Sequence, residues 1–204
     1  MGKMIEDPEG YFRGLIPPRD DLLLELEKEA ERETIKIVGP VMGELLFILV
    51  RAGKAARILE LGTAIAYSTI YLARGCQSPE GRLISIEHDP AMADRARRNL
   101  EKAGVQAGIE VRVGEARDLM AAMGEPFDFI FMDIDKESYT TILPHCARLL
   151  KVGGLLVTDN VAFTASKEFN LEIFQSKDWR VLHLLSFLPG HSPERDGWSL
   201  SLRL

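Results

Sequence analysis

Five short apolar segments, separated by stretches of helical pattern, follow one another between Arg57 and Asp159. They occupy residues 57–62, 83–87, 109–113, 127–133 and 154–159. Runs of this kind, rich in Ile, Leu, Val and Phe, are typical of strands that are covered on both faces. Repeated strand–helix–strand units close by right-handed crossovers, which makes the strands parallel and places helices on both sides of them. The pattern therefore predicts a doubly wound α/β domain.

Helix signals between these segments support the alternation. The best defined helix is expected over residues 90–103, because Asp89 can cap its start and Gly104 can end it. Ser138–Leu150 is also expected to be helical, although Pro144 should break or kink an interior turn.

The first quarter of the chain has a different pattern. Residues 20–33 and 41–52 carry apolar side chains at helical spacing, which predicts two helices before the first strand. No repeat or linker-like segment divides the chain. We therefore expect a single domain over residues 1–204, with a helical N-terminal extension over 1–54 and an α/β core over 55–204.

The C-terminal segment is expected to form a hairpin. Residues 181–187 have a strand pattern, and residues 198–204 alternate strictly between apolar and polar. A loop rich in Pro and Gly separates them. The complete prediction is a seven-stranded, mostly parallel sheet with an antiparallel C-terminal strand.

Composition excludes several classes of protein. The net charge of −6 disfavours non-specific binding to nucleic acid. The longest apolar run, Leu45–Val50, has 6 residues, far below the ~20 that span a bilayer. The first ten residues lack the apolar segment of a signal peptide. Cys76 and Cys146 lie in segments of helical pattern and are expected to be reduced thiols. We therefore expect a cytoplasmic protein without a membrane partner.

Polar residues gather where the predicted strands end. In a doubly wound sheet, ligands bind beyond the carboxyl ends of the strands. The residues expected at that edge are Glu60, Gly62, Thr63 and Ser68 after the first strand, Glu87 after the second, Glu115 after the third, Asp133, Asp135 and Lys136 after the fourth, and Asp159 and Asn160 after the fifth.

The first strand-to-helix turn suggests a nucleoside ligand. It lacks the second glycine of a dinucleotide fingerprint, since Ala64 stands there, and it lacks the Gly-Lys-Ser/Thr of a phosphate-binding loop. Its small residues still allow a ligand to approach the backbone closely. Glu87 stands where α/β folds place an acid for ribose hydroxyls. The alternative is a solvated acid at the end of a strand.

A second group of residues suits a divalent cation. Asp133, Asp159 and Asn160 offer carboxylate and amide oxygens, which Mg²⁺ and Ca²⁺ prefer. Lys136 could act there as a base if its surroundings lower its pKa. The alternatives are ordinary turn residues and an exposed lysine. The four histidines are scattered and form no pair at the spacing of metal ligands.

Taken in order, the motifs resemble those of the cation-dependent O-methyltransferases that use S-adenosylmethionine, which include the catechol and caffeoyl-CoA enzymes. The matching strings are ILELGTAIAYST, ISIEHDP, GEA, FIFMDIDKESY and LLVTDNV. The resemblance covers residues 37–160 well and the flanks more loosely. It implies a Rossmann-like methyltransferase fold.

The resemblance also implies roles for single residues. S-adenosylmethionine would lie against Val38, Glu60, Gly62, Thr63, Ser68, Glu87, Ala116 and Asp133. A divalent cation, Mg²⁺ first and Ca²⁺ or Mn²⁺ as alternatives, would bind Asp133, Asp159 and Asn160. Lys136 would be the general base and Asp135 would touch the acceptor, a phenol with two neighbouring oxygens. The resemblance also implies a homodimer, for which the amphipathic N-terminal helices could form an interface, although they could equally just cover the sheet.

The chain departs from the family pattern in three places. Ala66 replaces a usual glycine and could crowd the cofactor. The segment 161–169 is short and has Thr164 in place of a commonly polar amide, and the loop 189–197 is long. These departures leave the acceptor undefined. They also keep open a non-catalytic module that binds S-adenosylmethionine. A nicotinamide-dependent oxidoreductase is a further alternative, and an RNA methyltransferase is disfavoured by the acidic charge balance.

Overall fold

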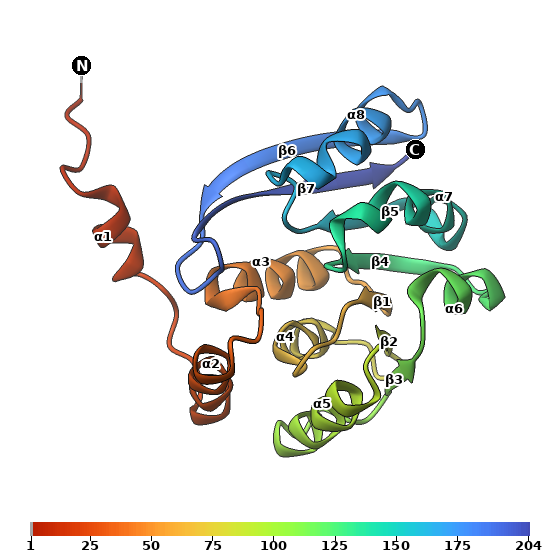
Figure 1. Ribbon diagram of the computed structural model, residues 1–204, viewed down its shortest axis with the longest axis horizontal. Coiled ribbons are helices and arrows are strands. Elements are labelled where there is room, and N and C mark those ends of the chain that lie inside the picture. The colour runs from red at the N-terminus through yellow and green to blue at the C-terminus, as the bar shows by residue number, and fades with distance from the viewer. Residues whose placement is uncertain (1) are drawn as a thin grey trace.

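A single twisted sheet runs through the molecule, and a computed structural model describes it over residues 2–204 (Figure 1). Met1, at the start of the predicted extension, lies outside the described residues. The strands are β1 (Arg57–Leu61), β2 (Arg82–Glu87), β3 (Ile109–Val113), β4 (Phe127–Met132), β5 (Leu150–Thr158), β6 (Trp179–Phe187) and β7 (Arg195–Arg203). Their order across the sheet is β3-β2-β1-β4-β5-β7-β6. Strand β7 pairs antiparallel with both β5 and β6, and the other four pairings are parallel, which confirms the predicted mostly parallel sheet with an antiparallel C-terminal strand.

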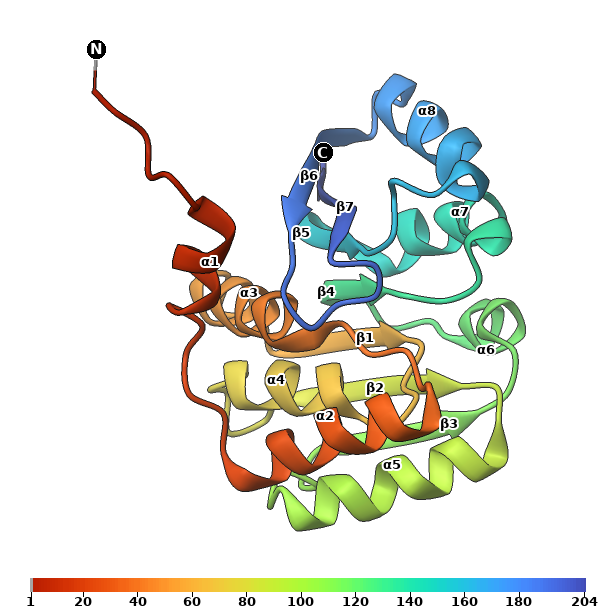
Figure 2. The same ribbon diagram turned by 60° about the vertical axis from the view of Figure 1, so that its left-hand side comes forward.

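Helices cover both faces of the sheet (Figures 1 and 2). They are α1 (Pro8–Arg13), α2 (Asp21–Glu33), α3 (Gly39–Ala52), α4 (Tyr67–Gly75), α5 (Pro90–Lys102), α6 (Ala116–Ala122), α7 (Tyr139–Leu149) and α8 (Lys167–Gln175), with 3₁₀ turns η1 (Lys136–Ser138) and η2 (Thr164–Ser166). Successive side chains of β4 point to opposite faces of the sheet. Phe131 packs in the core on the face covered by α2 to α5, and Ile130 packs in the core on the face covered by α6 to α8. These are called the α2–α5 core and the α6–α8 core.

The predicted cap of α5 is present, and α2 has a similar one that was not predicted. Asp89 accepts a hydrogen bond from the backbone N–H of Ala91, and Asp20 accepts one from that of Leu23. Each carboxylate satisfies a helix N–H that has no partner within the helix. These caps fix where α2 and α5 begin. Within residues 2–204, no helix combines the length and apolar character needed to cross a bilayer.

Three local expectations were wrong. Pro144 lies inside α7 without breaking it, because the buried face that includes Ile142 and Cys146 outweighs one missing hydrogen bond. Cys76 caps the end of α4 and does not lie within it. Strand β7 begins at Arg195, before the alternating pattern starts, because the backbone already pairs Arg195 with Phe187.

The turn between β1 and α4 requires unusual backbone angles. Gly62 has φ +96°, and a Cβ there would lie 2.0 Å from the carbonyl oxygen of Asp133. Only glycine therefore lets the ends of β1 and β4 approach this closely. Ala66 has φ 69° and ψ 22°, the left-handed region that costs a residue with a Cβ about 1–2 kcal/mol. Its methyl group is fully buried in the α2–α5 core.

These backbone angles predict that replacement by Gly changes the free energy of unfolding differently at two buried alanines. Replacing either Ala66 or Ala96 by Gly removes a buried methyl worth about 0.8 kcal/mol. In the interior of α5, Ala96→Gly adds a helix penalty of about 1 kcal/mol, so its free energy of unfolding should fall by about 2 kcal/mol. At Ala66 the relief of left-handed strain offsets the loss, so Ala66→Gly should stay within about 1 kcal/mol of the parent. Urea unfolding measures both, and equal losses would contradict the assigned backbone strain.

Candidate functional site

A cleft of about 880 Å³ opens at the carboxyl ends of the parallel strands. Its walls come from the β1–α4 turn, the end of β2, the start of α6, the segment after β4 and residues 33–38. Among the predicted site residues, those that line it are Val38, Gly62, Thr63, Ser68, Glu87, Ala116, Asp133, Asp135 and Lys136. Ala66 does not line the cleft, so its methyl group lies away from any ligand there.

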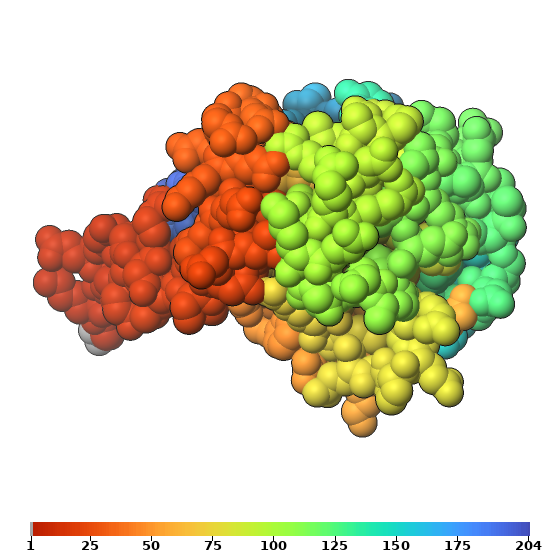
Figure 3. All heavy atoms as spheres, turned by 90° about the horizontal axis from the view of Figure 1, so that it is seen from below, coloured from red at the N-terminus to blue at the C-terminus, as the bar shows by residue number. Residues whose placement is uncertain are grey.

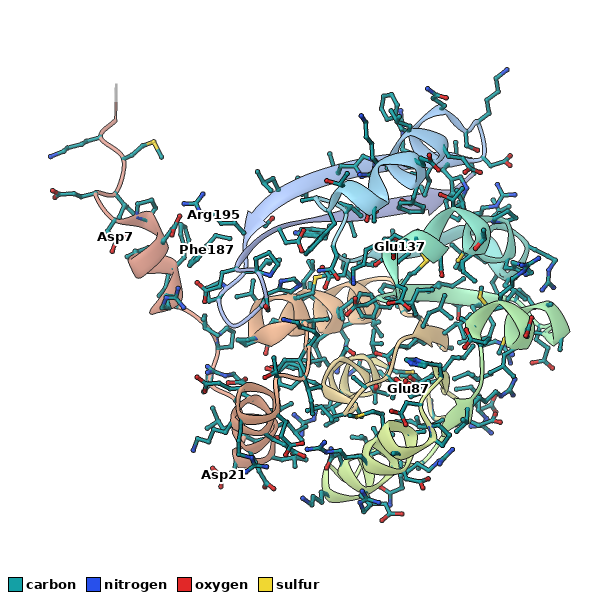
Figure 4. The ribbon with its side chains drawn as sticks, in the orientation of Figure 1. Asp7, Asp21, Glu87, Glu137, Phe187 and Arg195 are labelled. Atoms are coloured by element: carbon teal, nitrogen blue, oxygen red, sulfur yellow. The ribbon has the colours of Figure 1, made fainter. Side chains whose placement is uncertain are left out.

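Glu87 is fixed at the wall of this cleft by backbone N–H groups. Its Oε2 accepts hydrogen bonds from Ala64 N at 2.8 Å and Thr63 N at 3.2 Å, and its Oε1 accepts one from Asp89 N at 3.0 Å. Figure 4 shows the side chain at the end of β2, facing the β1–α4 side. The carboxylate is thus held by the turn that a ligand would approach, and its remaining lone pairs can accept hydroxyl donors.

Glu60 has a different place from the one expected. It was expected to line the cleft, but it is fully buried beneath it. Its carboxylate accepts hydrogen bonds from the hydroxyls of Ser68, Thr69 and Ser85 at 2.5–2.6 Å. Burial raises the pKa of Glu60 to about 7 against the effect of these three donors. Glu60 therefore supports the cleft from below by joining β1, β2 and α4.

Asp133 and Asp159 are brought together by the sheet. The N–H of Asp133 donates to Leu61 O, and that of Asp159 donates to Met132 O, so the ladder continues to both residues. Asp133 lies at the cleft and is partly exposed, whereas Asp159 is buried behind it. Burial, followed by the negative charge of Asp159, raises the pKa of Asp133 to about 6. The nearest cation is Lys136, whose Nζ is 3.4 Å from Asp133 Oδ1.

Asn160 is oriented by a residue that the sequence reasoning missed. Its amide nitrogen donates to Asp196 Oδ2 at 2.8 Å. Among residues 2–204, no donor pairs with the amide oxygen of Asn160. Asp196 lies near the start of β7. The one sequence signal for its role is the Asp-Gly pair at the end of the long loop. The amide is therefore turned so that its oxygen is available as a ligand.

His191 is the second residue that was missed. Its Nε2 lies 2.8 Å from Asp159 Oδ2, and its Nδ1 lies 2.8 Å from Pro193 O. Because both ring nitrogens face acceptors, the ring is an imidazolium. Burial alone would lower the pKa of His191, but the hydrogen bond and charge of Asp159 outweigh burial and raise it to about 9. The unusual length of its loop was the only signal in the sequence.

The donor set fits a divalent cation on chemical grounds. Within residues 2–204, no three His, Cys, Asp or Glu side chains converge to hold a metal by themselves. Two carboxylates with the oriented Asn160 oxygen still form a hard, all-oxygen set, which Mg²⁺ completes with water.

Comparisons with known proteins identify the family of this chain. Residues 18–185 match the family model described as O-methyltransferase. A catechol O-methyltransferase of Niastella koreensis is 38% identical over 166 residues, which cover 78% of this chain and 74% of that protein. A Bacillus cereus O-methyltransferase solved in complex with SAH superposes with a TM-score of 0.86 at 29% identity and covers 96% of each chain. A Streptomyces achromogenes O-methyltransferase in complex with SAM gives 0.86 at 27% identity, covering 98% of this chain and 99% of that one.

The burial of Glu60 predicts a pH-dependent contribution to stability. Since its pKa is near 7 in the folded protein and about 4.5 when unfolded, only the folded state holds this proton at pH 5–7. Protonated Glu60 therefore stabilises the folded state at low pH. As the pH rises through 7, this stabilisation is lost and the free energy of unfolding falls by up to about 3 kcal/mol. Glu60→Gln, which cannot ionise, should gain stability relative to the parent between pH 5 and pH 8.

Urea unfolding at the two pH values measures this difference. Glu101→Gln on the exposed side of α5 is the matched control and should follow the parent at both pH values. A Glu60→Gln variant that also follows the parent would show that the Glu60 pKa is not raised.

Proposed function

The chain belongs to the O-methyltransferase family, and on that premise we propose that it transfers a methyl group from S-adenosylmethionine to one hydroxyl of a small, catechol-like acceptor with the help of a divalent cation. Family membership confirms the resemblance carried by the ordered motifs. It also confirms the expected class of enzyme, an S-adenosylmethionine-dependent O-methyltransferase.

The observation that carries the proposal is the position of the Asp133–Asp159 pair beside the cleft. Glu87 at the far wall can accept the two ribose hydroxyls of a nucleoside. Gly62 and Thr63 allow close approach to the backbone between Glu87 and Asp133. A cofactor held in this way would extend from Glu87 toward Asp133. Its methyl group would then lie near the carboxylate pair.

The chain's own residues then have definite tasks. Asp133, Asp159 and Asn160 would hold the cation, which lowers the pKa of a bound phenol hydroxyl. Lys136 extends from η1 to the same place. As a neutral amine, the form that a neighbouring divalent cation would favour, it would take the phenol proton at its Nζ. No nucleophile of the enzyme is needed, because the acceptor oxygen attacks the methyl carbon directly. Catalysis then consists mainly of holding the oxygen and the methyl group in line.

The acceptor is proposed to enter beside residues 34–37. This segment lines the cleft on one side and a second hollow, of about 710 Å³, on the other. The far wall of that hollow is formed by residues 189–194. Asp135 lies exposed at the cleft and would contact the acceptor from the opposite side. The long loop that departs from the family pattern would thus help to select the acceptor.

Removal of the cation should reduce methyl transfer and leave cofactor binding intact. Asp159→Asn leaves the cleft lining intact because Asp159 does not line it. Methyl transfer to a panel of catechols should fall about 100-fold or more with this variant or with a chelator, since a Lewis acid contributes several kcal/mol. Affinity for S-adenosylhomocysteine, measured by calorimetry, should change less than about three-fold.

Asp94→Asn, on the exposed surface of α5, is the matched control and should keep parent activity. Full activity with a chelator and in Asp159→Asn would rule out the cation. Binding of S-adenosylhomocysteine without transfer to any phenol would favour the non-catalytic module.

We also propose that α1 forms part of a homodimer interface. This helix projects from the body of the molecule (Figures 1, 2 and 3) and has no buried residue. Tyr11, Phe12 and Leu15 are each at least half exposed. Tyr11 and Phe12 belong to the helix and Leu15 to the turn after it. An exposed apolar group on a projecting segment is typical of a surface that pairs with another chain. The helix is held to the body by the ion pairs Arg13–Glu194 and Glu9–Arg195 and by Arg13 over the Phe187 ring. Figure 4 labels Phe187 and Arg195 beside α1.

Light scattering tests this interface. The parent protein should be a dimer at micromolar concentration, and the double variant Phe12→Asp, Leu15→Asp should be a monomer. Val152→Asp changes an exposed apolar residue of β5 and should leave the dimer intact. A parent monomer, or a dimer that survives the double variant, would contradict the role of α1.

A further inference from the structure

The loop between β6 and β7 places a buried histidine directly on one of the proposed cation ligands. His191 and Asp159 are both buried, and His191 Nε2 lies 2.8 Å from Asp159 Oδ2. The other oxygen of Asp159, Oδ1, accepts the backbone N–H of Asn160 at 2.9 Å. Each oxygen of this carboxylate therefore has one protein donor and one lone pair left for another partner.

The geometry places His191 behind the ligands and not among them. The amide nitrogen of Asn160 faces Asp196 Oδ2 at 2.8 Å and His191 Nε2 at 3.4 Å. The amide oxygen of Asn160 must then point away from both residues, because oxygen and nitrogen lie on opposite sides of the amide carbon. A cation bound to that oxygen would lie on the side of Asn160 away from His191.

The loop holds the imidazole rigidly. His191 Nδ1 donates to Pro193 O at 2.8 Å, and the backbone N–H of His191 donates to Leu188 O at 2.9 Å. Gly39 packs so closely on this loop that a Cβ there would lie 2.7 Å from the carbonyl carbon of Gly190. Leu188 N also donates to Glu194 O and closes the loop. The ring therefore has little freedom to leave Asp159.

We propose that His191 is a positioning residue for the cation site, acting through Asp159. A ligand carboxylate can rotate about its side-chain bonds, and a fixed donor on its outer oxygen selects one rotamer. Partners of this outer kind typically change metal affinity by 10–100-fold when they are removed. This inference rests on the proposed function, since it assumes that a cation binds at Asp159.

The test measures cation affinity without turnover. Binding of Mn²⁺ to the full chain is followed by the electron paramagnetic resonance signal of the free ion, for the parent, His191→Ala and His191→Gln. His191→Ala should weaken binding about ten-fold or more. His191→Gln, whose amide nitrogen can take the place of Nε2, should stay within about three-fold. Affinity for S-adenosylhomocysteine should be unchanged in both, because His191 does not line the cleft.

The outcomes separate this inference from the function on which it rests. Equal or tighter Mn²⁺ binding by His191→Ala would overturn the proposal, because His191 would then have no effect on cation affinity or would weaken it. Equal losses in the Ala and Gln variants would also overturn it, because a positioning donor is rescued by Gln. If the Ala variant does not fold, His191→Asn, which reaches the place of Nδ1 only, should show the same loss. A parent that binds S-adenosylhomocysteine but no Mn²⁺ would refute the cation itself.

Discussion

Burial of negative charge at one edge of the sheet is the constraint on which the rest of this structure depends. Glu60, Glu87, Asp133 and Asp159 all stand at the carboxyl ends of strands that end side by side. Each buried carboxylate needs donors, because a charge without them is costly in a low-dielectric interior. Glu60 has three hydroxyls, Glu87 has three backbone N–H groups, and Asp159 has a backbone N–H and an imidazolium. Among residues 2–204, the one side-chain donor to Asp133 is Lys136 at 3.4 Å, so the carboxylate with the fewest donors is the one that faces the cleft.

The need to supply donors to these four carboxylates explains the positions of several other elements. The left-handed residues of the β1–α4 turn aim N–H groups at Glu87, and Gly62 permits the contact between the ends of β1 and β4. Helix α7 contributes Tyr139, whose hydroxyl donates to Asp159 O. The β6–β7 loop contributes His191, and α1 is tied to that loop through Glu194. Segments far apart in the sequence thus stabilise one polar site, and the apolar layers on each face keep the strands in register.

The sheet, the C-terminal hairpin with its antiparallel strand, the helix capped by Asp89 and the edge residues could be predicted from the sequence, because periodicity and caps are local signals. The position of Glu60 beneath the cleft could not be predicted, since the packing of α4 on β1 decides which side chains near the turn are exposed to the cleft. Pro144 was misjudged because local propensity was weighed without the burial of α7. His191 and Asp196 were missed because they reach Asp159 and Asn160 across 32 and 36 residues of chain, a contact that no short motif encodes.

We infer that the Asp133–Asp159 pair holds a cation beside a cofactor that is anchored by Glu87. The decisive measurement is a crystal structure with S-adenosylhomocysteine and Mn²⁺ in which the anomalous signal of manganese is recorded. We expect the ribose against Glu87 and one manganese peak among Asp133, Asp159 and the amide oxygen of Asn160. A well-defined ligand in the cleft with no manganese peak at these residues would refute the cation site.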